Sequence, residues 1–200
     1  NTRGAGMSVF ADYLDLQTAV IEHVANADIA DVMPRMVKMA ETTFNNRLRC
    51  REMMDSATLT VMNGSASLPG DYLESIGLFD GAGREYVQQP VHMVKEGHDN
   101  GFYAITDGFL LVNSDGARRL DYYAALPSLT LSMTANNWLL LRHPSLYLYA
   151  VGYEAAKYLR DLELAQATKA LLEMEFAEVA AVDASARYSR ARIILPGVTP

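Results

Sequence analysis

The chain has 200 residues and a formal net charge of -7 at pH 7, with half of its residues hydrophobic and a fifth charged, which is typical of a globular protein and excludes disorder as its dominant state. The negative charge argues against a general nucleic-acid coat, because affinity for a phosphate backbone comes chiefly from Lys and Arg. The single cysteine, Cys50, excludes an internal disulfide and fits synthesis in a reducing cytoplasm, and no apolar stretch is long enough to cross a membrane.

Residues 1–14 are predicted to form a flexible leader. The run before Met7 consists of polar and small residues, and no apolar core of a secretory signal follows it. We therefore exclude this segment from the predicted fold.

Residues 15–55 are predicted to form a helical hairpin. Asp15 is expected to cap the first helix, and Asp31 the second, which has Pro34 in its first turn. The apolar residues recur with the helical period, so each helix should bury one face. These residues are Leu16, Val20, Ile21 and Val24 in the first helix and Met33, Val37, Ala40, Phe44 and Leu48 in the second. We interpret the methionines as core rather than as an adaptable binding face.

Residues 56–126 are predicted to form an inserted β module. From residue 58 the helical period gives way to short β-type runs separated by Gly and Asn, and Asn63-Gly64 is typical of a tight hairpin turn. The expected strands cover residues 58–61, 75–79, 84–87, 101–106, 108–112 and 120–124. Short strands at this spacing favour a small antiparallel sheet or sandwich.

Residues 127–187 are predicted to supply the C-terminal helices that complete a helical bundle. The run 137–149 is apolar and contains the only Trp of the chain. Because Pro is tolerated in a first helical turn, we expect a helix to begin at Pro144 and to reach Lys157. The run is either an ordinary core helix entered through a Pro turn or, as we prefer, a packing motif of an assembling protein. The residues expected to hold this core are Trp138, Pro144, Tyr147 and Tyr149.

A last long helix is predicted to begin near Asp161, and residues 188–200 are predicted to form an extended apolar tail. The tail either folds back onto its own domain or docks on a neighbour. One seam of the helix should consist of Leu164, Ala167, Leu171 and Met174, with Leu172, Phe176 and Val179 beside it. Together the segments predict an α+β protein, a helical bundle with an inserted sheet or sandwich module and an extended C-terminal tail.

Charge is segregated along the chain. The second helical segment and the tail are basic, whereas the segment between Glu154 and Asp183 is acidic. Such segregation suits charge-steered contact between copies or with partners. The basic residues are Arg35, Lys38, Arg47, Arg49 and Arg51 in the helical segment and Arg187, Arg190 and Arg192 towards the tail.

The sequence contains no recognisable catalytic, metal or cofactor site. Its histidines, which are His23, His92, His98 and His143, do not have the spacing of metal ligands. Gly81-Ala82-Gly83 is typical of a hairpin turn rather than of a phosphate-binding loop, and Asp71 and Glu74 are explained by a Pro-Gly turn. We expect no enzymatic activity and no cofactor.

The order of several motifs resembles the tailed-phage head-to-tail connector family, the adaptor proteins that form a ring under the portal. The matching segments are residues 39–53, residues 68–74, Tyr103-Ala104-Ile105 with its Gly-turn hairpin, residues 120–127 and residues 137–149. They extend over nearly the whole chain. The sequence departs from the family pattern at Gly70, where another small residue is common, and in its long apolar tail.

The resemblance implies a virion structural protein at the interface of head and tail, made in the host cytoplasm. It would assemble, as twelve copies, onto the portal protein after packaging, extend the channel for double-stranded DNA and offer a platform for a tail or stopper protein. The implied roles are subunit or DNA contact for Arg47, Arg49 and Arg51, and portal docking for Arg190, Arg192, Ile193, Ile194 and Leu195. An acidic channel wall would let DNA slide, and no membrane partner is implied.

Two alternatives remain open at this stage. The chain is also compatible with a nucleic-acid-binding protein that uses Arg47, Arg49 and Arg51 as a phosphate patch. A hydrolase would require a pocket that brings His143 or His92 together with a carboxylate and a hydroxyl.

Overall fold

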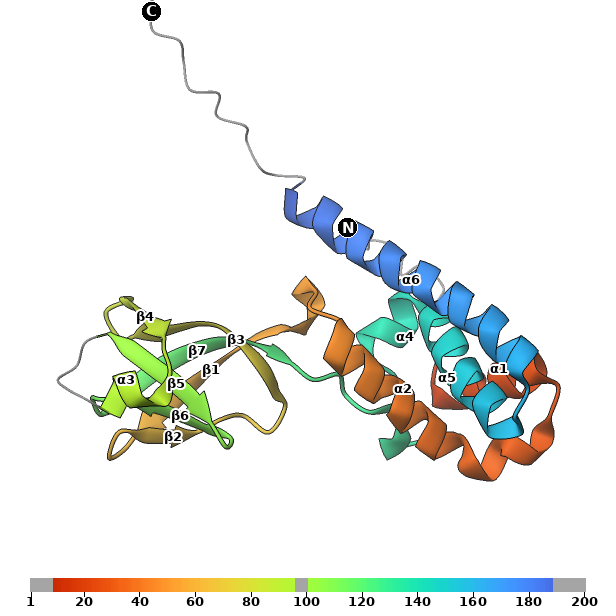
Figure 1. The fold of residues 1–200 in the computed structure, drawn as a ribbon, viewed down its shortest axis with the longest axis horizontal. Coiled ribbons are helices and arrows are strands. Elements are labelled where there is room, and N and C mark those ends of the chain that lie inside the picture. Colours follow the sequence, from red (N-terminus) through yellow and green to blue (C-terminus); the bar gives the residue numbers. More distant parts are fainter. Residues whose placement is uncertain (1–8, 96–100, 189–200) are drawn as a thin grey trace, which may run out of the picture. The chain divides into compact units, whose positions relative to one another are not determined.

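The computed structural model describes residues 9–95 and 101–188, and its mixture of helices with a sheet confirms the α+β class (Figure 1). Within these residues the chain forms two compact units, each described here by itself. The helical unit comprises residues 9–50 and 127–188, and the sheet unit comprises the described part of residues 51–126. The sheet unit thus begins at Arg51 rather than at residue 56, its predicted start.

Five α-helices and two short 3-10 helices make up the described helical unit. They are α1 (Tyr13–Val24), η1 (Ala27–Val32), α2 (Met33–Arg47), η3 (Leu129–Leu131), α4 (Trp138–Arg142), α5 (Pro144–Leu159) and α6 (Leu162–Tyr188). All of the predicted tail beyond Tyr188 lies outside the described residues, as do its proposed docking residues Arg190, Arg192, Ile193, Ile194 and Leu195.

The start of α1 corrects two predictions. Asp12, not Asp15, is the cap: its Oδ1 accepts a hydrogen bond from the Asp15 backbone N–H at 3.1 Å, and Asp15 Oδ2 in turn accepts from the Ala11 N–H at 3.0 Å. This reciprocal pairing satisfies two backbone donors at the helix start. The predicted leader 1–14 is also too long, because Phe10 and Tyr13 are both buried.

The start of α2 differs from the prediction as well. Asp31 does not cap this helix, since η1 leads directly into Met33 and the cap position, Val32, makes no side-chain hydrogen bond. Pro34 lies in the first turn as expected, where its missing N–H costs no helical hydrogen bond. The chain enters α2 already in a helical conformation, so a side-chain cap is not needed.

Helix α5 is the centre of the helical unit. Helices α1 and α2 both pack on it instead of forming a hairpin that closes on itself, and α6 lies along it (Figure 1). Three of these helices meet at an aromatic cluster, where Phe44 of α2 contacts Tyr147 of α5 edge-on at 4.9 Å and Phe176 of α6 at 6.0 Å between ring centroids. Aromatic pairs in this geometry stabilise a core beyond the area that they bury.

Residues 137–149 form two helices rather than one. Asn137 caps α4, with its Oδ1 accepting from the Leu140 N–H at 2.9 Å, and α5 then begins at Pro144 as predicted. His143 separates them with a non-helical backbone, φ -131° and ψ 60°. A helix rarely continues through the residue before Pro, because the Pro ring disfavours the helical conformation there.

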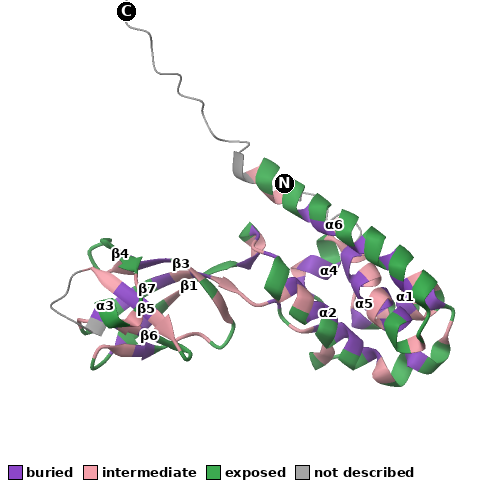
Figure 2. Cartoon of the chain, viewed as in Figure 1, coloured by how far each residue is buried: buried purple, intermediate pink, exposed green. Residues whose placement is uncertain are grey.

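Leu172, Phe176 and Val179 of α6 are buried as predicted, but the seam predicted beside them lies on the wrong face of the helix. The residues that α6 buries are Ala165, Thr168, Leu172, Phe176 and Val179. Leu171 and Met174 are instead exposed, at 39% and 67% of their surface, and Ala167 is exposed too. Figure 2 shows buried and exposed residues alternating along α6. Both stripes have helical spacing, so periodicity alone does not tell which of them meets α5.

The sheet unit contains seven strands and one short helix. These are β1 (Met54–Val61), β2 (Ser65–Ser67), β3 (Tyr72–Asp80), β4 (Glu85–Gln88), α3 (Val91–Lys95), β5 (Phe102–Thr106), β6 (Phe109–Val112) and β7 (Gly116–Ala124), preceded by the 3-10 turn η2 (Arg51–Met53). The strand order is β1-β7-β3-β4-β5-β6-β2.

The sheet is mixed, which corrects the prediction of an antiparallel one. All its pairs are antiparallel except β4 with β5, which is parallel in the register Val87 to Phe102 and Gln88 to Tyr103. A parallel pair needs a crossover connection, and the segment that contains α3 provides it. Strand-by-strand patterns do not reveal such a crossover.

The first and last strands of this order are joined by a tight turn, so the sheet curls on itself. Met62 and Ser65 form an antiparallel bridge around Asn63 and Gly64, whose φ values are 52° and 75°. The Asn63-Gly64 turn was predicted from the sequence and is confirmed. Positive φ at both central residues is the geometry that favours this residue pair in hairpins.

Replacement of Gly64 by Ala is expected to destabilise the sheet unit by about 1–3 kcal/mol. The alanine would have to keep the left-handed backbone conformation of Gly64, and its Cβ would lie 2.9 Å from the Val112 carbonyl oxygen. Gly70→Ala is the matched control, since a Cβ at Gly70 meets nothing within 4 Å. Hydrogen exchange of the β2 and β6 amides would measure the effect. Equal protection in both variants would contradict the prediction.

Candidate interaction surfaces

Two of the three arginines predicted as a patch line a groove of the helical unit. The groove lies between the C-terminal end of α2 and the second half of α6, and its volume is about 630 Å³. Arg47 and Arg49 line the groove from the end of α2 and the residues after it, whereas Glu173, Ala177 and Asp183 line it from α6. The groove therefore carries both signs of charge rather than a basic patch.

Arg47 is engaged within its own helical unit. Its Nη1 and Nη2 donate to the two carboxylate oxygens of Glu173 at 2.7 and 2.6 Å, and its guanidinium lies 3.8 Å from the centroid of the Phe176 ring. The hydrogen bonds from Arg47 hold the pKa of Glu173 below its ordinary value. This fork geometry fixes both side chains, although the pair is too exposed to contribute more than about 1 kcal/mol to stability.

The other two arginines of the predicted patch have different surroundings. Arg49 Nη1 donates to the carbonyl oxygens of Asn45 and Leu48, at 2.7 and 2.6 Å, and so binds the end of α2. Cations are favoured at this end of a helix, where carbonyl groups lack helical partners. Arg51 is exposed and belongs to the sheet unit.

The predicted aromatic motif contributes to the core to different extents. Tyr147 is completely buried, whereas Trp138 and Pro144 are half-buried. Tyr149 is also half-buried and contacts the His23 ring edge-on at 6.0 Å. The motif thus lies where α4 and α5 join the rest of the helical unit.

A buried carboxylate that the sequence analysis missed holds the returning chain in place. Glu41 of α2 is only 6% exposed. Its Oε1 accepts from the Leu129 N–H and its Oε2 from the Ser128 hydroxyl, both at 2.7 Å. A signal was present, because Val37, Glu41 and Phe44 have the spacing of one helix face, and a buried acid needs hydrogen-bond partners.

A second polar contact lies in the same region of the core. Asn137 Nδ2 donates to the Tyr147 hydroxyl at 2.7 Å and to the Pro127 carbonyl at 2.9 Å. Burial, together with the charge of Glu41, raises the pKa of Tyr147, and burial raises the pKa of Glu41 against the opposing effect of its two hydrogen bonds. These groups satisfy one another inside the core, which is the only low-energy way to bury them.

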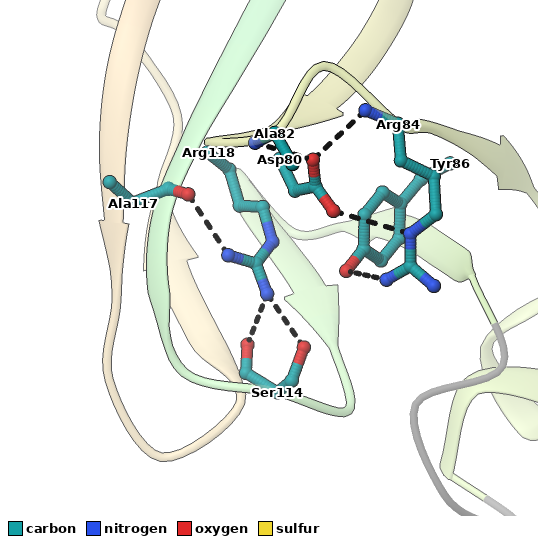
Figure 3. Close-up of polar contacts among 7 residues, drawn as sticks. All are labelled: Asp80, Ala82, Arg84, Tyr86, Ser114, Ala117 and Arg118. Atoms are coloured by element: carbon teal, nitrogen blue, oxygen red, sulfur yellow. Dashed lines mark hydrogen bonds and ion pairs between the residues drawn. The ribbon is translucent and has the colours of Figure 1, made fainter.

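Strand β7 of the sheet unit carries a buried arginine, shown in Figure 3. Arg118 donates to the Ala117 carbonyl at 2.9 Å and to Ser114 Oγ at 2.6 Å, and its guanidinium lies 5.3 Å from the centroid of the Tyr86 ring. Nearby, Asp80 accepts from two backbone N–H groups of the 81–84 turn and from Arg84 Nε at 3.2 Å. The Gly81–Gly83 segment is thus a hairpin turn closed by Asp80, as its sequence predicts.

The described residues do not gather side chains of the kind that hold a metal ion. Among them no group of three or more His, Cys, Asp or Glu side chains could hold a metal ion. Asp71 serves a structural purpose, since it accepts a hydrogen bond from the Tyr122 hydroxyl at 3.1 Å, and burial raises the pKa of Tyr122 to about 12. His98 lies outside the described residues. In the part of the chain that the structure covers, no helix is both long and apolar enough to span a membrane.

The fold and these surfaces describe a two-unit α+β protein whose charged and apolar side chains are available for contacts with other molecules. A family model described as SU10 adaptor protein matches residues 11–194, a range that includes both units. The chain belongs to this family, a phage head-tail adaptor family, and thus has a structural role in the virion. A search of the curated proteins gives no match.

Replacement of Glu41 by Gln is expected to change how stability depends on pH. Burial raises the pKa of Glu41 above its ordinary value of 4.5, so the folded protein binds this proton more tightly than the unfolded chain does. The free energy of unfolding should therefore fall as pH rises from 4.5 through the folded pKa, and Glu41→Gln should lose this part of the dependence. The free energy of unfolding can be measured at each pH by urea unfolding, followed by the fluorescence of Trp138 in the helical unit.

Glu163→Gln is the matched control, because Glu163 is an exposed acid of the same unit. Its pH profile should run parallel to that of the wild type. A Glu41→Gln profile that also runs parallel to the wild type would contradict the prediction.

Proposed function

We propose that this chain is a head-to-tail connector whose copies form a ring beneath the portal, prolong the DNA channel and provide a platform for the next tail or stopper protein. The observation that carries the proposal is the family match, which extends from the first turn of α1 through both units. An adaptor has to present separate surfaces to separate partners. A chain with two compact units has such surfaces without any large rearrangement.

The helical unit suits the wall of a ring. Its core unites α1, α2 and α6 around α5, so a lateral load on one helix is shared with the others. Repetition of one contact between copies closes a ring when the rotation per copy permits it, and many weak contacts then add. Twelve copies remain the expected number.

The C-terminal tail is proposed to dock on the portal through Arg190, Arg192, Ile193, Ile194 and Leu195. The support comes from composition, since these residues join a basic pair to an apolar run. An extended apolar segment can add to a sheet edge or fill a groove on a partner.

Double-stranded DNA is proposed to pass through the ring without being bound tightly. The chain is acidic overall, and repulsion between an acidic wall and phosphates would let DNA slide. In the nucleic-acid alternative Arg47 would contact phosphate, but Glu173 already occupies its guanidinium. Arginines lining the bore, with the acidic residues outside, would contradict a repelling wall.

Truncation after Tyr188 is expected to abolish assembly on the portal. The intact chain, mixed with the purified portal of its phage, should add a ring that is visible by negative-stain electron microscopy, whereas the truncated chain should leave portals bare. Circular dichroism and the Trp138 emission should be the same for both, because every described helix and strand is retained.

A second variant distinguishes the contribution of the tail arginines to portal binding from that of the apolar run. Arg190→Ala with Arg192→Ala keeps the apolar run and should weaken binding without abolishing it, in a salt-dependent manner. Failure of the intact chain to bind the portal under all conditions would overturn the proposed function. Equal binding by the truncated chain would overturn the role of the tail alone.

A further inference from the structure

Helix α6 has a second, mostly apolar stripe that is separate from the one it buries. We define the outer seam as Ala167, Leu171, Met174, Glu178 and Val182, which are all exposed and recur at intervals of three or four residues. Met174 and Val182 expose 67% and 51% of their surface. A helix with a single packed face does not need a second apolar stripe of this length, and exposed apolar patches on a folded protein mark contact sites.

The outer seam faces away from α2. Leu171 and Glu173 are two positions apart and so point to nearly opposite sides of the helix. Glu173 reaches α2 through its paired hydrogen bonds with Arg47. Leu171 and Met174 therefore lie on the flank of α6 that α2 does not cover.

A pocket of complementary chemistry lies on the α2 side of the same unit. The first half of α2 and the end of α5 enclose a mostly apolar cavity of about 330 Å³. Met36, Met39 and Tyr158 line it, and Met39 and Tyr158 are 46% and 57% exposed. Methionine side chains adapt to the shape of an inserted apolar group, so the pocket can receive a side chain such as that of Leu171 or Met174.

The charges around the two surfaces are opposite. The pocket is lined by Arg35 and by Lys157 paired with Glu154 at 2.7 Å, so its three charged side chains carry a net positive charge that comes from Arg35. The outer seam contains Glu178 and is bordered by Glu175, and the pKa of Glu175 is raised by burial and by the charge of Glu178. A basic partner would relieve the repulsion between these two carboxylates.

We propose that the outer seam of one copy docks in the α2–α5 pocket of the next copy. The two surfaces consist of different residues of the same unit, so the contact is head-to-tail and each copy offers both halves of it. Such a contact repeats until the ring closes. This inference rests on the proposed function and specifies the contact between copies that the ring requires.

Cysteine cross-linking tests the contact directly. Cys50 is the only cysteine and is buried, so a Cys50→Ala background allows two new sites to be read without interference. Met39→Cys with Met174→Cys should give a ladder of covalent oligomers when portal-bound rings are treated with a short bismaleimide. Met174→Cys alone should give no ladder, because each copy then has one site.

Met39→Cys with Ala177→Cys is the matched control, because Ala177 lines the groove on the α2 side of α6. This pair should not form a ladder. A ladder of equal strength from this control, no ladder from the test pair in complete rings, or cross-linking of Met174→Cys only to the portal would overturn the proposal.

Charge reversal provides an independent test. Glu178→Lys and Arg35→Glu should each lower the apparent affinity between copies about tenfold through like-charge contact, and the double variant should recover most of it. Both positions are exposed, so the thermal stability of the isolated chains should not change. Rings that form equally well with either single variant would overturn the proposal but leave the connector function intact.

The outcome also separates this inference from the proposed function. If the wild-type chain does not bind the portal, the connector function fails, and the same cross-linking at high concentration in solution then decides the contact between copies. A ladder there supports the contact, and its absence overturns it.

Discussion

The helical unit depends on how the chain is held where it returns from the sheet unit. Tyr147 is fully buried among the helices, and its hydroxyl accepts from Asn137, which also caps α4. Asn137 also donates to the Pro127 carbonyl, and Glu41 of α2 accepts hydrogen bonds from the next two residues, through the Ser128 hydroxyl and the Leu129 N–H. Because unpaired polar groups in a core are costly, these bonds allow one arrangement of the returning chain. The position of α5, on which the other helices pack, follows from it.

The packing of α6 on α5 determines which of its faces stay exposed. With its core side committed to α5, α6 has one flank beside α2 and another that is free to meet a different molecule. On the α2 flank, Glu173 accepts two hydrogen bonds from the Arg47 guanidinium, which is therefore not available to bind phosphate. The outer seam of α6 and the α2–α5 pocket are mostly apolar, with charge at their borders, which suits contact between proteins more than recognition of nucleic acid.

The sheet unit is closed at the turn that joins the first and last strands of its order. Its strands curl until β1 and β2 meet at the Asn63-Gly64 turn, so the unit does not leave its first and last strands wholly open. Open edges invite unwanted pairing with other chains. Because the chain forms two compact units, each can present its own surface to a structural partner in the phage particle.

The sequence by itself determined the elements with local causes: the Asn63-Gly64 turn, the start of α5 at Pro144, and most of the strands. Its ordered motifs also indicated the adaptor family, since they depend on residue order rather than on contacts. Only the tertiary structure decided which stripe of α6 is buried, that Glu41 lies in the core, and that β4 and β5 run parallel. Each of these depends on what a segment meets across the fold, and helical or strand periodicity is the same whether a face meets a neighbour or solvent.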